Sequence, residues 1–141
     1  MQNVRVLFFL FCLSSLLSCH QAVTPPDAYT TDLVQAKVWF PGHWRLTKMY
    51  TMGSGSAVPN VQLIVTDDQQ IRLVRDGKQT DLVSYKINET PYDFQLKTTA
   101  QPREDNWYLR DPSLRIAPNR LFLDTGMAGD LPGFLFERIN P

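Results

Sequence analysis

The sequence predicts an all-β domain, an antiparallel up-and-down barrel of about eight strands with a short helix before it. From Gly42 onward apolar and polar residues alternate with period two, and turn residues interrupt the alternation at short intervals. Only one segment, residues 32–39, has a helical pattern. Strands joined to their neighbours by short turns favour a closed barrel, which has no free sheet edge. A two-sheet sandwich is the alternative.

The expected helix is DLVQAKVW, Asp32 to Trp39. Leu33, Val34 and Val38 would form its apolar face. Pro41-Gly42 follows and would end it.

The alternating segments define the expected strands and their turns. In chain order they are HWRLTKMYT (43–51), NVQLIVT (60–66), QIRLVR (70–75), TDLVSYKI (80–87), YDFQLKT (92–98), PSLRI (112–116), RLFLDT (120–125) and GFLFERI (133–139). Asp76-Gly77 lies between the third and fourth strands and is a favoured pair for a tight primed turn, because glycine tolerates positive φ. Asp67-Asp68 fits a second hairpin connection.

The N-terminus has the pattern of a secretory signal. Arg5 supplies positive charge, and the run VLFFLFCLSSLL is apolar but too short to span a membrane as a helix. Leu16-Leu17-Ser18-Cys19 then resembles the bacterial lipoprotein box. The resemblance implies that the Cys19 thiol takes a diacylglyceryl group, that the chain is cut before Cys19, and that the new amine is acylated, for example with palmitate. An ordinary secretory signal with an incidental cysteine is the alternative.

This interpretation divides the chain into a signal peptide (1–18), a tether (19–31) and a barrel domain (32–141). The tether contains few large apolar residues and two consecutive prolines, which is typical of an extended spacer. The formal net charge is zero, and removal of residues 1–18 takes away only Arg5, which leaves about −1. The absence of a basic surplus argues against nucleic acid as a partner. We expect a monomer anchored in the bacterial cell envelope, on the outer membrane, facing the periplasm or the surface.

A second resemblance concerns Gly42-His43-Trp44. It matches the G-x-W signature that opens the first strand of lipocalins and related calycins, and GHWRLTKMYTMG is similar to the start of small lipocalin-like domains of bacterial lipoproteins. Gly42 would let the chain turn into the barrel, and Trp44 would close one end with a large apolar surface. The resemblance implies that Arg138 in the last strand packs over Trp44, which is a structural role.

No arrangement of residues predicts catalysis, so we expect no enzyme. The chain has two histidines, His20 and His43, and alternation places His43 outside the barrel. With Cys19 acylated, no cluster of histidine and cysteine remains to bind a metal, and no G-x-S-x-G nucleophile elbow is present. No cofactor is expected.

The barrel interior is the expected binding site. Inward faces of the strands would line it with apolar and phenolic side chains, which suit a small hydrophobic molecule. The candidate ligand-binding residues are Tyr50, Leu63, Leu73, Tyr85, Phe94 and Leu123. Strict alternation also turns Lys48 inward, unless a bulge turns it out. The alternative is a filled core, in which case the protein would act as an interaction or inhibitor module through the loops 53–59, 100–106 and 125–132.

Overall fold

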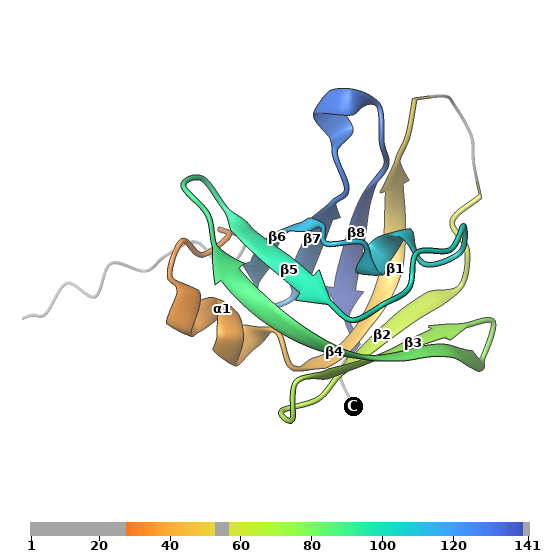
Figure 1. The fold of residues 1–141 in the computed structure, drawn as a ribbon, viewed down its shortest axis with the longest axis horizontal. Helices are drawn as coiled ribbons and strands as arrows, with labels where there is room; N and C mark the ends of the chain where they lie inside the picture. Colours follow the sequence, from red (N-terminus) through yellow and green to blue (C-terminus); the bar gives the residue numbers. More distant parts are fainter. Residues whose placement is uncertain (1–27, 53–56, 140–141) are drawn as a thin grey trace, which may run out of the picture.

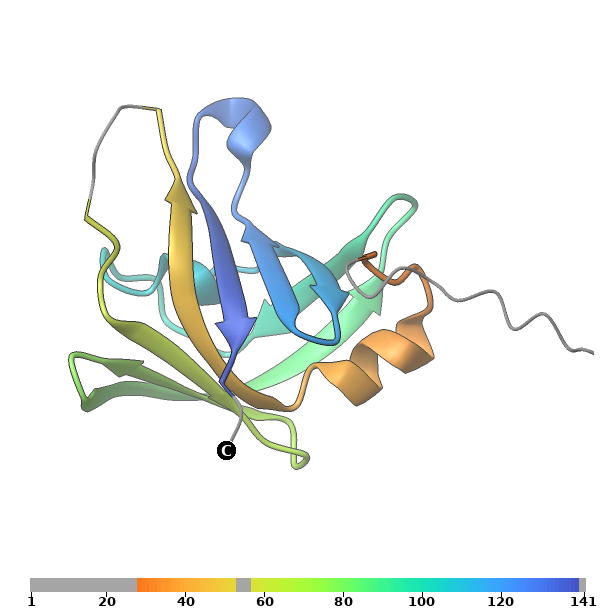
Figure 2. The ribbon, with the colours of Figure 1, turned by 180° about the vertical axis from the view of Figure 1, so that it is seen from behind.

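A computed structural model describes residues 28–52 and 57–139. These residues form one α-helix, two short 3-10 helices and eight strands (Figures 1 and 2). The elements are α1 (Leu33–Trp39), β1 (Gly42–Tyr50), β2 (Val61–Val65), β3 (Gln70–Arg75), β4 (Lys78–Glu89), β5 (Phe94–Thr98), η1 (Trp107–Leu109), β6 (Ser113–Ala117), β7 (Arg120–Asp124), η2 (Met127–Gly129) and β8 (Gly133–Arg138).

The eight strands form a closed antiparallel barrel. Each strand pairs with the next along the chain, and β8 pairs with β1 to close the ring. The predicted barrel is therefore confirmed, and the two-sheet sandwich is excluded. The meander sends the loops β1–β2, β5–β6 and β7–β8 to one end, which we call the mouth. Helix α1 lies at the other end (Figure 1).

Helix α1 buries a different face from the one expected. Asp32 caps its N-terminus, where the carboxylate oxygen accepts a hydrogen bond from the amide of Val34 at 2.8 Å. Ala36 is fully buried, whereas Val34 and Val38 are 70% and 67% exposed. The prediction of an apolar face through Val34 and Val38 is wrong, because the helix packs through Leu33, Ala36 and then Phe40, at positions i, i+3 and i+7.

The turn between β3 and β4 has the predicted form. Asp76 and Gly77 both have positive φ, 51° and 78°, as a type I′ turn requires. Such a turn matches the twist of the flanking strands and sets the pairs Arg75–Lys78 and Val74–Gln79; beyond them the register shifts by one residue, so that Leu73 lies opposite Asp81.

A β-bulge in β1 changes the direction of three side chains. The register against β8 shifts between Leu46 and Lys48, so Lys48 lies opposite Leu135 and Met49 opposite Phe134. Phe134 is a buried core residue, so the bulge places Met49 inside the barrel. Lys48 is exposed, and Tyr50 points outward, where its ring meets Phe122 edge-to-face at 5.7 Å. The prediction of Tyr50 as an interior residue is therefore wrong.

Candidate functional site

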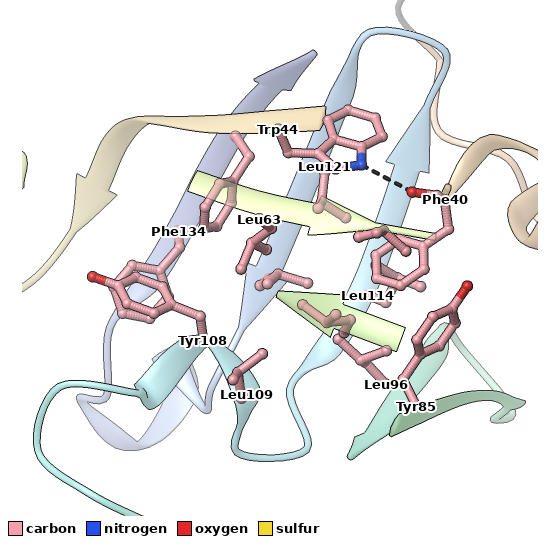
Figure 3. Close-up of a cluster of buried hydrophobic side chains, with 14 of the residues drawn as sticks. Phe40, Trp44, Leu63, Tyr85, Leu96, Tyr108, Leu109, Leu114, Leu121 and Phe134 are labelled. Atoms are coloured by element: carbon pink, nitrogen blue, oxygen red, sulfur yellow. Dashed lines mark hydrogen bonds between the residues drawn. The ribbon is translucent and has the colours of Figure 1, made fainter. Parts of the chain in front are cut away.

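The barrel interior is packed solid along its middle. Five of the six predicted interior residues are buried, from 0% exposed for Leu63 and Leu123 to 8% for Tyr85. A side chain with no accessible surface adjoins no space that a water molecule could enter. Leu63, Leu73 and Leu123 thus fill a core and line no cavity for a ligand. Figure 3 shows Leu63 among the other buried side chains of this core.

One end of this core is closed by three aromatic side chains (Figure 3). The indole nitrogen of Trp44 donates a hydrogen bond of 2.9 Å to the carbonyl of Phe40. The ring of Phe40 meets Tyr85 edge-to-face, with the centroids 4.9 Å apart. Phe40 and Trp44 are both fully buried, so the end beside α1 is sealed.

Arg138 joins the last strand to this sealed end. Its guanidinium lies over the ring of Trp44, with Cζ 4.1 Å from the centroid, as the resemblance implied. Nε donates to the carbonyl of Pro118 at 2.7 Å, Nη1 donates to the carbonyl of Pro41 at 2.9 Å, and Nη2 donates to the carbonyl of Trp39. Partial burial lowers the pKa of Arg138 from its ordinary value. Arg138 therefore has a structural role: its hydrogen bonds hold Trp39, Pro41 and Pro118 next to β8. We call this arrangement the clamp.

Gly42 is required where the clamp meets β1. Its φ is 141°, which side chains rarely adopt, and an added Cβ would lie 2.0 Å from Nη1 of Arg138. Gly42, Trp44 and Arg138 therefore act together to close this end of the barrel; we call them the closure residues.

The other end of the core is covered by the 3-10 helix η1, which we call the plug and which the sequence pattern did not predict. Tyr108 packs on Phe134 and Phe136, with ring centroids 4.5 Å and 5.8 Å away. Leu109 is 1% exposed. Trp107-Tyr108-Leu109 lies between the expected loop 100–106 and the expected strand 112–116, and its one sequence signal is the three consecutive large apolar residues. The plug leaves a hollow only on the outer side of Tyr108.

That hollow is a pocket of about 530 Å³ at the mouth. Its floor is apolar, and charged side chains stand around it. The lining residues are Met49, Thr51, Met52, Ala57, Pro59, Arg75, Glu104, Asp105, Trp107, Tyr108, Asp130, Pro132 and Phe134. None of the six predicted ligand-binding residues lines it; the bulge brings Met49 here in place of Tyr50.

The loop that carries Glu104 and Asp105 is held by an internal network. Asn106 is fully buried, its side-chain amide donates to the carbonyl of Gln101 at 2.8 Å, and its side-chain oxygen accepts from the amide of Arg103 at 2.8 Å. Arg103 makes two hydrogen bonds to Asp81, of 3.0 and 2.7 Å, and one of 3.0 Å to Asp105. The hydrogen bond from Arg103 lowers the pKa of Asp105, so this carboxylate is charged at neutral pH. Burial raises the pKa of the Tyr108 phenol, which is neutral there.

A second pocket of about 470 Å³ lies beside α1. Lys37, Asp67, Gln69, Lys86 and Asn88 give it a polar and mostly exposed lining, with Pro41, Tyr85 and Ile87 behind them. Five of its eight lining residues are charged or amide side chains, whereas most lining residues at the mouth are apolar, so the mouth is the better candidate for binding an apolar group.

In the ranges 28–52 and 57–139 no three His, Cys, Asp or Glu side chains are placed to hold a metal ion. His43 lies against Gln62, with Nε2 2.8 Å from Oε1. The described part of the chain also contains no helix long and apolar enough to cross a membrane. Cys19, His20 and the loop residues 53–56 lie outside the described residues.

The comparisons with known proteins add no family. The closed antiparallel barrel is consistent with the fold that the lipocalin resemblance implies. No family model, curated protein or solved structure matches the chain.

Proposed function

We propose that the chain is a lipid-anchored, non-enzymatic interaction module of the bacterial cell envelope that binds a partner protein at the mouth of its lipocalin-like barrel. The observation that carries the proposal is a solid barrel core combined with an apolar, exposed rim. A barrel that transports a small hydrophobic molecule needs interior space, and the buried residues around Leu63 and Leu123 leave none.

The rim consists of apolar side chains on loops that surround the mouth pocket. Met52 is 79% exposed, Val58 43% and Leu131 40%. Exposed apolar side chains gathered beside a hollow mark interaction sites, and flexible methionine suits a surface that adapts to its partner. Trp107 adds an aromatic anchor in the pocket, of the type that dominates binding energy at interfaces.

A photo-crosslinking experiment in cells tests the partner. A photoreactive amino acid at Val58 or Leu131 should give adducts of one discrete mass with another protein. The same group at Leu82 is the matched control, because Leu82 is 54% exposed but lies on the side of the barrel, in β4. Adducts from Leu82 with equal yield, or no adducts from the mouth, would remove the proposal.

A second candidate function is binding of a small amphipathic molecule at the mouth. The pocket volume of about 530 Å³ favours it, because small-molecule sites measure about 300–1,000 Å³. Native mass spectrometry of protein purified from its own membrane tests this alternative. A non-covalent small molecule that leaves on Trp107→Ala, together with the absence of crosslinks from Val58, would favour the small molecule over the protein partner.

A further inference from the structure

The mouth pocket combines an apolar floor with an excess of negative charge. Met49, Trp107, Tyr108 and Phe134 supply the floor. Around it stand one guanidinium, from Arg75, and three carboxylates, from Glu104, Asp105 and Asp130. Because Asp105 is paired with Arg103, the remaining formal charge of the lining is +1 − 2 = −1.

The two loops that bear these carboxylates have defined conformations. Asp130 follows η2 with φ of 65°, and its amide donates to the carbonyl of Met127 at 3.2 Å. The segment with Glu104 and Asp105 is tied to the buried Asn106 and to Arg103. Loop backbones that are already ordered cost little conformational entropy when a ligand arrives.

Two of the carboxylates are available to a ligand. Asp105 is paired with Arg103, whose guanidinium also binds Asp81. Within the described residues no ion pair involves Glu104 or Asp130, and both residues are exposed. A ligand whose apolar group enters the floor would therefore bring its neighbouring groups next to two exposed carboxylates that have no ion-pair partner among the described residues.

From this arrangement we infer that the mouth selects a segment of its partner protein in which an apolar side chain is flanked by lysine or arginine. The inference rests on the proposed function, since it names the chemistry of the partner at the same site. The apolar side chain would supply burial, and the flanking cations would supply charge complementarity and discrimination against acidic segments.

The test uses the lipidated protein in nanodiscs of phosphatidylcholine, whose headgroup has no net charge, with empty nanodiscs as blank. Three fluorescent peptides share a Leu-Trp-Leu centre and differ in their flanks, which are lysines, serines or glutamates. Fluorescence anisotropy should show the lysine peptide binding about ten-fold more tightly than the serine peptide, from about three-fold for each exposed charge pair. The glutamate peptide should bind most weakly, and added salt should reduce the differences.

Charge-neutral variants test whether the named carboxylates are responsible. Glu104→Gln with Asp130→Asn keeps the shapes of both side chains, and asparagine tolerates the positive φ at position 130. This double variant should bind the lysine and serine peptides within about two-fold of each other. Asp67→Asn with Glu89→Gln, at the other end of the barrel, is the matched control and should keep the full preference.

The outcomes separate this inference from the proposed function. Equal binding of the three peptides, or a preference that survives in Glu104→Gln with Asp130→Asn, would overturn the selection for basic segments. Crosslinks from Val58 and Leu131 together with either result would leave the protein-binding role in place. Displacement of the lysine peptide by dodecyltrimethylammonium at equal or lower concentration would overturn the peptide as occupant and identify a cationic small molecule.

Discussion

At the scale of single residues, Arg138 connects segments that are far apart in the chain. Its guanidinium donates to the carbonyls of Trp39, Pro41 and Pro118 and covers the ring of Trp44. A lysine ammonium has three donors, but they leave a single nitrogen and it has no planar face, so it cannot reproduce contacts that come from three separate nitrogens and a flat group over the ring. The sequence predicted the stacking through its resemblance to the G-x-W signature. The three carbonyl contacts could not be predicted, because they depend on where two loops place their backbones.

The contact between the closure residues Trp44 and Arg138 predicts that substitutions at the two positions have coupled effects on stability. Trp44→Ala should lower the free energy of unfolding by about 3–5 kcal/mol, since it empties a fully buried site. Arg138→Ala should cost about 2 kcal/mol or more, because the stacked cation contributes about 0.5–2 kcal/mol and its hydrogen bonds are lost too. Denaturant unfolding of both single variants and the double variant measures their coupling, which we expect to be at least about 0.5 kcal/mol. Strictly additive losses would mean that the contact contributes nothing.

At the scale of elements, the sequence predicted all eight strands and left open a bulge at Lys48, but it did not predict the plug at η1. Alternation is a regular signal, so the strands and the Asp76-Gly77 turn follow from it. The bulge between Leu46 and Lys48 had one sequence signal, because strict alternation would have turned Lys48 into the barrel; it adds one residue, and every side chain after it in β1 changes face. The plug at η1 forms because Tyr108 finds Phe134 and Phe136 across the barrel, which is a tertiary contact.

The plug should stabilise the barrel as strongly as a core strand residue. Tyr108→Ala should lower the free energy of unfolding by about 3–5 kcal/mol, as expected for a large buried aromatic side chain. Tyr92→Ala is the matched control, because Tyr92 is 96% exposed; its effect should stay within about 0.5 kcal/mol. Urea unfolding measures both.

The filled core of the barrel predicts that a hydrophobic dye does not bind inside it. An environment-sensitive dye should find no site in the wild-type interior, since Leu73 is 1% exposed. Saturable binding of the dye that Leu73→Trp abolishes, in a variant that stays folded, would show that the interior has space after all.

At the scale of the whole molecule, the described chain begins next to the barrel wall. The amide of Thr30 donates to the carbonyl of Ile116 in β6 at 2.9 Å. Residues 19–28 span at most about 30 Å even when fully extended. If Cys19 carries the anchor, the domain stays within that distance of the membrane.

The proposed anchor predicts a change of location for the entire protein. Cys19→Ser should abolish incorporation of labelled palmitate and release the protein from the membrane fraction, because the serine hydroxyl does not replace the thiol in lipoprotein processing. Metabolic labelling followed by sedimentation checks both effects. A variant that still incorporates palmitate and sediments with membranes would show that another residue is acylated.

The clamp at Arg138 also determines when during synthesis the barrel can be completed. The ribosome makes β1 first and β8 last, and the contact with Pro41 joins residues 97 positions apart. Until the final strand emerges, β1 and β7 each present a free edge, and such long-range pairing forms slowly compared with the hairpins. A frameshift or stop codon that removes residues 133–141 would therefore leave seven paired strands with two open edges, a species exposed to proteases and to aggregation. Closure of the barrel, and with it protection of both sheet edges, therefore depends on the synthesis of β8.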